Sequence, residues 1–450
     1  MNTQKWHAHA TAWGVTTAWS ATAARRAGVL IGCTALVLAV TGTTAEAGPR
    51  ELGRQTLAAN DGWASAGTGT TGGSAAGAAQ VSTVTTWAEF KAALAAGGTA
   101  PKIIKVRGTI DANAEGCDSF AAPGYDFARY LADYDPAVWG YDQVVSGEQE
   151  DLRAASAANQ DTAIKAYVPA DTTIVGIGRN AGFKGASLQI KDVDNVIVRN
   201  LSFESPLDCF PQWDPTDGDT GNWNSEYDSA VIYGATHVWL DHNTFTDGDH
   251  PDSSLPTYYG RIYEQHDGEL DIVKGADYVT ASWNVFADHD KTILIGNSDS
   301  ASTAAVDRGH LKVTLHHNLF TGLVERAPRV RFGQVDSYNN HFVADSTYSY
   351  SYSYGIGMES QLVAEHNAFT LPDSVSAALV LKKWKEAPLT AADNYVNGRL
   401  TDLIAVHNAE IPAETLQSGA GWTPALRTEI DPPRAVPGIV DHRAGAGKIC

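Results

Sequence analysis

The sequence has 450 residues, of which 43% are hydrophobic and 19% are charged, and it contains 42 glycines. This composition is typical of a folded protein and unlike that of a disordered chain. The formal net charge of −20 argues against non-specific nucleic-acid binding, because such binding needs a basic face that releases phosphate counterions. A polyanionic ligand would be repelled at long range, so it must be held by local cations.

The first 47 residues have the features of an export signal. Arg25-Arg26 precedes an apolar run from Ala27 to Val40, and Ala45-Glu46-Ala47 offers small residues where a signal peptidase could cut. The run is too short to span a bilayer comfortably, and no later segment reaches about 18 apolar residues. We therefore expect residues 1–47 to be a signal peptide and the mature protein to be secreted without a membrane anchor.

Removal of this leader leaves three cysteines, Cys117, Cys209 and Cys450. In an oxidising compartment three thiols allow one disulfide and leave one cysteine over. We expect Cys117 to pair with Cys209, because Cys450 is the last residue and chain ends are commonly frayed. None of the three has the spacing of a zinc site.

The next part of the chain leads into a β-rich body. Residues 48–80 are rich in Gly, Ala, Thr and Ser, and we expect a flexible leading segment there. Thr86-Trp-Ala-Glu89 has the form of a capping box ahead of an alanine-rich helix that ends at Gly97-Gly98. Lys102–Ile110 follows as a β-strand. We expect the helix to cap the open end of an all-β body.

Two stretches depart from the β pattern. Residues 116–165 are rich in Asp, Tyr and Ala and show a helical period near Glu148 to Ile164, which predicts a long excursion with one or two helices. The tail from Asn394 to Cys450 mixes Asp, Pro, Gly and Ala with a few apolar runs. We expect this tail to pack across the outside of the body.

From Asp171 onward short β-rich runs recur. In five of them an aliphatic residue is followed five positions later by Asn and seven positions later by Phe. A sixth block, Val196–Phe203, shares the apolar pattern but has Leu201 where the Asn would stand. The five complete blocks are Val238–Phe245, Val279–Phe286, Val313–Phe320, Val335–Phe342 and Leu362–Phe369.

This repeat is typical of a right-handed parallel β-helix in which each block belongs to one coil. Each Asn side chain can hydrogen-bond to the next along a turn, and each Phe can stack inside the coil. The unequal spacing of the blocks suits coils with loops of different lengths and not a helical array. A β-sandwich with chance similarity is the alternative. We predict an all-β fold over residues 81–450, one parallel β-helix domain with an N-terminal capping helix and long loops.

Acidic residues with a possible metal-binding role lie in the middle of the chain. Asp267 and Asp271 are four positions apart, so on a strand they face the same way. Asp228 would lie about 4.8 Å away if it occupied the neighbouring coil in matching register. Three carboxylates without Cys or His ligands suit a hard ion, and flexible geometry favours Ca²⁺ over Mg²⁺. The alternative, to which spacing gives about equal weight, is a set of solvated surface acids.

Basic residues follow the acidic ones. Lys291 comes directly after Asp290, and Arg326-Ala-Pro-Arg-Val-Arg331 gathers three arginines. Cations beside a metal suit an anionic substrate that the metal bridges. The alternative is that the arginines are exposed strand positions, with Pro328 marking an edge. The histidines inside the repeat blocks are expected to have hydrogen-bonded structural roles: His242, His316 and His317.

Three motifs resemble the signatures of the pectate lyases of polysaccharide lyase family 1, in its secreted bacterial branch. They are Val238-Trp-Leu-Asp-His242, Asp267-Gly-Glu-Leu-Asp271-Ile and Arg326-Ala-Pro-Arg-Val-Arg331. The likeness runs from about Asn60 to Gly447. It implies a parallel β-helix and a Ca²⁺-dependent cleavage of de-esterified homogalacturonan, which is also called polygalacturonate or pectate.

The resemblance also implies roles for single residues. Arg326 would take the C5 proton of a uronate, after which the C4–O bond breaks by β-elimination and leaves 4,5-unsaturated oligogalacturonides. Lys291 and Arg331 would bind substrate carboxylates. The primary Ca²⁺ would be bound by three aspartates, Asp228, Asp267 and Asp271.

An arginine base requires a lowered pKa, because the free guanidinium has a pKa above about 12. Lys291, Arg331 and the metal are expected to lower the pKa of Arg326, as like charges do, and this predicts an alkaline optimum. We expect a monomer whose partner is the anionic polysaccharide, with neither nucleic acid nor membrane involved. Three alternatives are a pectin lyase that needs no calcium, a polygalacturonase-type hydrolase, and a calcium-stiffened β-helix that only binds polysaccharide.

Overall fold

The computed structural model describes residues 51–345, 348–428 and 430–449. The chain divides into two units, Met1–Gly48 and Pro49–Cys450, and all described residues belong to the second. The expected signal peptide therefore lies outside the described residues.

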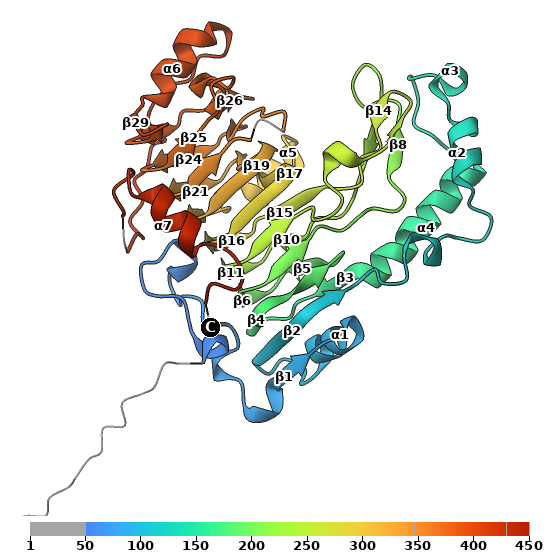
Figure 1. Cartoon of the computed structure of the whole chain (residues 1–450), viewed down its shortest axis with the longest axis horizontal. Helices are drawn as coiled ribbons and strands as arrows, with labels where there is room; N and C mark the ends of the chain where they lie inside the picture. Colours follow the sequence, from blue (N-terminus) through green and yellow to red (C-terminus); the bar gives the residue numbers. More distant parts are fainter. Residues whose placement is uncertain (1–50, 346–347, 429, 450) are drawn as a thin grey trace, which may run out of the picture. The chain divides into compact units, whose positions relative to one another are not determined.

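Parallel strands stacked along one axis make up the body of this second unit (Figure 1). A coil contributes up to three strands, and each strand pairs with its counterpart in the next coil, so that three strand columns run along the axis. The first column consists of β3 (Lys165–Tyr167), β5 (Ser187–Lys191), β10 (Ala230–Tyr233), β15 (Gly268–Val273), the end of β17 (Val285–Ile295), β20 (Arg329–Val330), β23 (Tyr354–Ile356) and β26 (Leu381–Lys383).

The other two columns are built in the same way. The second consists of β1 (Val81–Val84), β2 (Lys102–Asp111), β4 (Thr172–Lys184), β6 (Asp194–Arg199), β11 (Thr236–Asp241), β16 (Asp277–Ser282), β18 (Val313–His316), β21 (Gln334–Tyr338), β24 (Gln361–Glu365) and β27 (Thr390–Ala392). The third joins the ends of β2 and β4 and the start of β17 to β7 (Ser202–Glu204), β12 (Thr244–Thr246), β19 (Leu319–Glu325), β22 (His341–Val343), β25 (Ala368–Thr370) and β28 (Tyr395–Val396). This parallel pairing confirms the right-handed β-helix and excludes the β-sandwich, whose sheets are antiparallel.

The repeated Asn residues form a continuous hydrogen-bonded ladder in the interior. Asn243 donates to Oδ1 of Asn284 from its backbone N–H at 2.9 Å and from its side-chain Nδ2 at 3.0 Å. The same two hydrogen bonds link every later pair. Leu201 takes part in the ladder only as a donor, through its backbone N–H. The ladder residues are Asn243, Asn284, Asn318, Asn340, Asn367 and Asn394.

The repeated Phe residues stack beside this ladder. The ring centroids of Phe203 and Phe245 lie 4.8 Å apart with an interplanar angle of 8°. Each following pair is also stacked, at 4.7 to 5.1 Å. Flat stacking at this distance follows from the strand spacing, which sets the rise from coil to coil. The stack consists of Phe203, Phe245, Phe286, Phe320, Phe342 and Phe369.

The helix expected near the N-terminal end of the body is α1 (Trp87–Ala95). Its capping box is present: Thr86 Oγ1 accepts from the backbone N–H of Glu89, and the Glu89 carboxylate accepts from that of Thr86. Phe90 is buried, with its ring centroid 4.7 Å from that of Phe183. Figure 1 shows α1 beside β1 and β2, at the end of the column, as a capping helix requires.

The prediction of a flexible leading segment is wrong for residues 51–80. Ala64 is buried, and its backbone N–H donates to Thr280 Oγ1 at 3.0 Å. A Cβ on Gly73 would lie 1.9 Å from the carbonyl oxygen of Lys102. The small residues that suggested flexibility therefore allow the backbone to lie directly on the sheet. The segment contains η1 (Leu52–Arg54), η2 (Trp63–Ser65), η3 (Gly72–Ala75) and η4 (Ala78–Gln80).

The excursion over residues 116–165 is helical and is fixed to the body at its start. The predicted disulfide between Cys117 and Cys209 is present. The long helix, α4, spans Glu148–Ile164, as the sequence period predicts. The excursion also contains η5 (Cys117–Ser119), α2 (Phe127–Asp133) and α3 (Pro136–Trp139). The other loops contain two antiparallel pairs, β8 (Gln212–Asp214) with β9 (Asn222–Asn224) and β13 (Thr257–Tyr258) with β14 (Arg261–Ile262).

The tail packs on the outside of the coil, as expected. Arg427 forms ion pairs with Asp336 at 2.5 Å and with Glu365 at 2.7 Å. The backbone N–H of Gly447 donates to Asn200 Oδ1 at 2.7 Å. None of the helices in the described parts of the chain has the length and apolar character that a bilayer crossing needs. The remaining elements are η6 (Asp252–Ser254), α5 (Ala301–Asp307), η7 (Ala377–Val380), β29 (Arg399–Leu400), α6 (Leu403–Glu410), η8 (Pro412–Glu414) and α7 (Val436–Arg443).

Candidate active site

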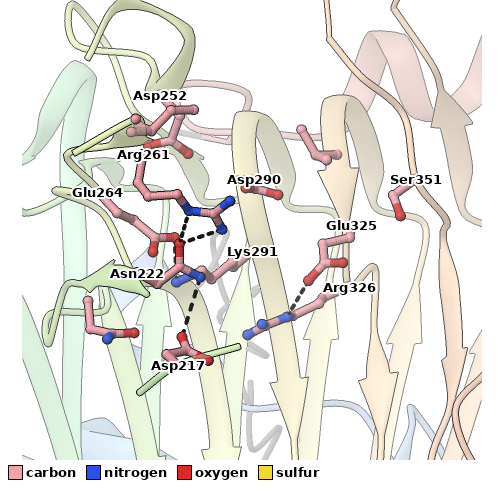
Figure 2. A pocket seen from close by; sticks show the side chains of 14 residues that line it. Asp217, Asn222, Asp252, Arg261, Glu264, Asp290, Lys291, Glu325, Arg326 and Ser351 are labelled. Carbon is pink, nitrogen blue, oxygen red and sulfur yellow. Dashed lines mark hydrogen bonds and ion pairs between the residues drawn. The ribbon is translucent and has the colours of Figure 1, made fainter. Parts of the chain in front are cut away.

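An open pocket of about 620 Å³ lies over the first strand column (Figure 2). Lys291 comes from β17, and Arg326 follows the end of β19. Both line this pocket, whereas Arg331 and the three predicted metal ligands are not part of its lining. Other polar side chains, from strands and loops, complete the wall: Asp217, Asn222, Asn224, Asp252, Arg261, Glu264, Asp290, Glu325 and Ser351.

Two of the three predicted metal ligands, Asp228 and Asp271, come together at the start of β15. The backbone N–H of Gly268 donates to Asp228 Oδ1 at 2.7 Å. A Cβ on Gly268 would lie 2.6 Å from Asp228 Oδ1 and 2.8 Å from Asp271 Oδ1. The two carboxylates therefore converge on one glycine from adjacent coils, and Asp267 is the residue just before it.

Burial and mutual repulsion make these carboxyl groups resist ionisation. Burial, together with the charges of Asp271 and Asp267, raises the pKa of Asp228 well above its usual range. Burial and the charge of Asp267 also raise the pKa of Asp271, although Arg326 and Lys291 oppose this. A bound cation would relieve the repulsion. The all-oxygen donor set fits a hard divalent ion such as Ca²⁺.

A second group of potential ligands lies close to the first. Asp247, Asp252 and His266 each offer one ligand atom, and these atoms lie within 4.8 Å of one another. The ligand atoms of the three predicted aspartates do not all come this close together. However, the ring nitrogens of His266 lie 3.0 Å from the carbonyl oxygen of Pro206 and 2.8 Å from that of His250. Because both nitrogens already have hydrogen-bond partners, we do not assign a metal to this second group.

His289 connects the second group to the first. Its Nδ1 lies 2.7 Å from Asp247 Oδ1, and its Nε2 lies 2.7 Å from the backbone carbonyl oxygen of Asp267. Both neighbouring atoms can only accept, so both ring nitrogens donate when the imidazole is protonated. Burial opposes protonation, but the charges of Asp247 and Glu269 outweigh it and raise the pKa of His289. The ring thereby holds the backbone that carries Asp267.

Lys291 lies between the aspartates and the pocket. Its Nζ is 2.5 Å from Glu264 Oε1 and 3.5 Å from Asp267 Oδ1. Burial favours the neutral amine, but the charges of Asp267 and Glu264 outweigh burial and raise the pKa of Lys291. The side chain is therefore a permanent positive charge beside the acidic cluster.

Arg326 is held by the residue that precedes it. It has a φ of 61°, and its Nε donates to Glu325 Oε1 at 2.8 Å (Figure 2). Burial favours the neutral guanidine, yet the charge of Glu325 outweighs burial and the pKa of Arg326 is raised. The expectation that neighbouring cations lower this pKa is therefore wrong for the protein alone, because the nearest charge is a carboxylate.

Arg331 is not part of the pocket lining. It is 9% exposed, and its Nε donates to Asp299 Oδ1 at 2.8 Å. Its Nη1 donates to the carbonyl oxygen of Gly296 at 2.8 Å. The structure thus places Arg331 near the other basic residues but already engaged with protein acceptors.

Two further residues of the wall, Arg261 and Asn222, have no counterpart among the residues predicted from the sequence. Nε and Nη2 of Arg261 donate to Asn222 Oδ1 at 2.9 and 2.7 Å (Figure 2). Both residues belong to β-hairpins inserted between coils, β8–β9 and β13–β14. Such insertions carry no repeat, so periodicity gives no signal for them.

Of the three histidines predicted to have hydrogen-bonded structural roles, His316 and His317 have hydrogen-bond contacts, whereas His242 Nδ1 has only an ion-pair contact. His242 Nδ1 lies 2.8 Å from Asp241 Oδ2. His316 Nδ1 lies 2.8 Å from His317 Nδ1, and the His316 ring stacks on Tyr338. These residues lie in or directly after the second strand column, whereas the pocket lies over the first.

Known proteins resemble this chain over most of its length. The family model described as pectate lyase matches residues 27–122 and 137–418. The pectate lyase of Bacillus subtilis (strain 168) is 45% identical over 426 residues, which are 92% of this chain and 98% of that relative. Pectate lyase D of Dickeya chrysanthemi is 40% identical over 357 residues, which are 77% of this chain and 80% of that relative.

Solved structures show the same likeness. The thermostable pectate lyase PL 47 superposes with a TM-score of 0.86 and 44% identity, covering 89% of this chain and all of that one. A pectate lyase bound to a hexasaccharide superposes with a TM-score of 0.83 and 44% identity, again covering 89% of this chain and 100% of the other.

Proposed function

Because the chain belongs to the pectate lyase family and is therefore a polysaccharide lyase, we propose that it is a secreted, Ca²⁺-dependent lyase of de-esterified homogalacturonan. The observation that carries this proposal is the meeting of a three-aspartate cluster with Lys291, whose Nζ lies 3.5 Å from Asp267 and which also lines the pocket with Arg326. An anionic polymer needs this pairing of a cation site with fixed positive charges in an acidic protein.

The metal site in this proposal consists of Asp228, Asp267 and Asp271. A bound Ca²⁺ would neutralise a substrate carboxylate and stabilise negative charge that develops beside it. Gly268 keeps the space between Asp228 and Asp271 free of a side chain. His289 holds the backbone of Asp267 through a hydrogen bond to its carbonyl oxygen.

Lys291 and Arg331 bind substrate carboxylates in this proposal. Lys291 can do so directly, because it lines the pocket and keeps its charge. Arg331 can do so only by exchanging Asp299, which now accepts from its Nε, for a substrate carboxylate. Asp299 is the more exposed partner, with 33% of its side chain accessible against 11% for Arg331, so Asp299 is the group that a substrate carboxylate would displace into solvent.

Arg326 is the proposed general base. In its neutral form it accepts the proton from C5, and the electron pair of that C–H bond forms the C4–C5 double bond. The C4–O bond breaks, and the departing oxygen takes up a proton. No water is consumed, so the new chain end is a 4,5-unsaturated uronate. Because Glu325 raises the pKa of Arg326 in the free protein, the neutral base is populated only at alkaline pH.

Ultraviolet absorbance tests this proposal most directly. The protein is incubated with polygalacturonate at alkaline pH, with Ca²⁺ and again with excess chelator. A rise in absorbance that requires Ca²⁺ is the expected result, since the unsaturated product absorbs. Reducing ends without absorbance would identify a hydrolase, and a chelator-resistant rise on methyl-esterified pectin would identify a pectin lyase. Binding of the polymer without any product would identify the protein as a β-helix that only binds polysaccharide.

The proposal also includes the location and the assembly of the protein. Residues 1–47 are proposed to be removed on export, and the mature protein is proposed to act as a monomer outside the cell. N-terminal sequencing of protein from culture medium should begin near Gly48. Light scattering should give the mass of one chain.

A further inference from the structure

A row of paired residues on the first strand column extends from the candidate active site to later coils. Asp271 on β15 pairs with Leu294 on β17, which pairs with Arg329 on β20. The same row continues through Gly355 on β23 to Lys382 on β26. Since residues in register on parallel strands share a face, the face that carries Asp271 also carries Arg329 and Lys382.

An exposed tryptophan lies at the far end of this row. Trp384 follows β26 and is 40% exposed. The guanidinium carbon of Arg329 lies 4.1 Å from its ring centroid, and Lys382 Nζ lies 5.8 Å from it. The Tyr352 ring meets it edge-on at 6.2 Å. The indole is therefore held in place by its neighbours while part of it remains open to solvent.

This cluster is continuous with the pocket. Ser351, which lines the pocket, directly precedes Tyr352 in the chain. The charge of Arg326, which also lines the pocket, acts on the phenol of Tyr352, and so does that of Arg329. Tyr352 thus interacts both with Arg326 of the pocket lining and with Trp384.

The two cationic side chains of the cluster, Arg329 and Lys382, can bind a further anion. Among the described residues no carboxylate lies within ion-pair distance of Arg329, and its buried Nε has no hydrogen-bond partner. Lys382 Nζ lies 2.8 Å from Glu414 Oε1, and about a third of each side chain is exposed. A pair this exposed is weak and can exchange its partner. An indole face with cations beside it suits a sugar ring that carries a carboxylate.

We propose that Trp384, Arg329 and Lys382 form a distal subsite that binds one uronate ring of the same polygalacturonate chain that the active site cleaves. This inference rests on the function proposed above. The indole packs against the C–H face of the ring, and the two cations meet its carboxylate. Lys382 lies three strand spacings from the strand of Lys291, about 14 Å along the axis, so only a substrate of several residues contacts both.

Substitution of the tryptophan separates this subsite from the active site. Trp384→Ala should lower kcat/KM on long polygalacturonate roughly 3- to 10-fold, mainly through KM. It should leave kcat/KM on trigalacturonate unchanged, because a trimer at the active site does not reach Trp384. Trp384→Phe should restore most of the loss. Tyr141→Ala is the matched control, since Tyr141 is 41% exposed and does not line the pocket.

Equal losses on polymer and trimer would overturn the subsite, and so would no loss on either. Melting temperatures show whether each variant is folded, and Trp384→Leu, which also removes the aromatic ring, takes the place of Trp384→Ala if that variant is not. If the wild type makes no unsaturated product, the proposed function fails and the subsite is tested by titration calorimetry with long polygalacturonate. Weaker binding by Trp384→Ala than by the wild type would then support the subsite, and equal or undetectable binding would overturn it.

Lys382→Gln tests the charge of the sugar. The Lys382→Gln variant should show a lower kcat/KM than the wild type on de-esterified polygalacturonate. The two should not differ on a partly methyl-esterified polymer of equal length, in which many carboxyl groups are neutral esters. The same relative loss on both polymers would remove Lys382 from the subsite.

Discussion

The backbone N–H of Gly268 donates to Asp228 Oδ1 at 2.7 Å, which joins two neighbouring coils at the point where the proposed metal ligands meet. This contact leaves no room for a side chain on β15 at that position. A Cβ there would lie 2.6 Å from Asp228 Oδ1 and 2.8 Å from Asp271 Oδ1. The proposed metal site, which takes its ligands from two coils, would therefore depend on one glycine between them.

We expect Gly268→Ala to weaken Ca²⁺ binding. The methyl group must push at least one carboxylate away, and disturbance of residues that orient metal ligands typically costs about 10- to 100-fold in affinity. The concentration of Ca²⁺ that gives half-maximal activity should rise by that factor. Gly438→Ala is the control, because a Cβ at Gly438 meets nothing within 4 Å. An unchanged Ca²⁺ requirement in Gly268→Ala would place the metal elsewhere.

Glu325 should set the pH at which the enzyme becomes active. Its charge raises the pKa of Arg326, so Glu325→Gln should lower that pKa. The rising limb of the plot of kcat/KM against pH should then move to lower pH. Glu325→Asp, which keeps the charge, should stay closer to the wild type. A limb that does not move in Glu325→Gln would argue against Arg326 as the titrating base.

Arg326→Ala should lose at least about 100-fold in kcat, because a general base typically contributes roughly 10²- to 10⁴-fold. The Ca²⁺ requirement should remain, since Arg326 is not among the proposed ligands. Stopped-time absorbance assays over hours would measure the residual rate. Nearly full activity in Arg326→Lys would contradict the assignment, because a lysine could not reproduce the placement of the guanidinium.

Asp241 should make the fold sensitive to acid. Burial opposes its ionisation, but Arg199, whose Nη2 lies 2.7 Å from Asp241 Oδ2, outweighs burial and lowers the pKa to about 2. A folded pKa below the ordinary value of 3.8 contributes stability that is present above about pH 4 and is lost as the pH falls toward 2. Asp241→Asn should remove this pH dependence and cost about 3 kcal/mol at neutral pH. Urea unfolding at pH 7, 4 and 3 would measure both effects.

The position of an Asn in the ladder should decide what its loss costs. Asn318 Oδ1 accepts two donors from Asn284, whereas Asn243 Oδ1 accepts only the backbone N–H of Leu201. Each buried donor left without a partner costs about 1–3 kcal/mol. We expect Asn318→Ala to lower the free energy of unfolding by about 1–3 kcal/mol more than Asn243→Ala does. Equal losses in urea unfolding would show that the side-chain donor of Asn284 finds another acceptor.

The sequence by itself determined the β-helix, because stacked coils repeat the same burial environment and so demand the same residues. Asn and Phe at fixed offsets in five blocks predict the ladder and the stack. Asn394 extends the ladder but was missed, since Val396 stands where the Phe would be. Residues 51–80 were misjudged because small residues suit both a loose chain and a close approach to a sheet.

The candidate site was likewise predicted from the sequence only in part. Four of the six predicted residues lie in the quoted motifs, which keep chain-local spacing, and the family resemblance supplies the other two, Asp228 and Lys291. Only the tertiary structure decided their surroundings: Glu325 beside Arg326, Asp299 on Arg331, and the hairpins with Arg261 in the pocket wall. Stacking brings residues of different coils within hydrogen-bonding distance, and the direction of a pKa shift depends on these neighbours. Sequence spacing does not record them.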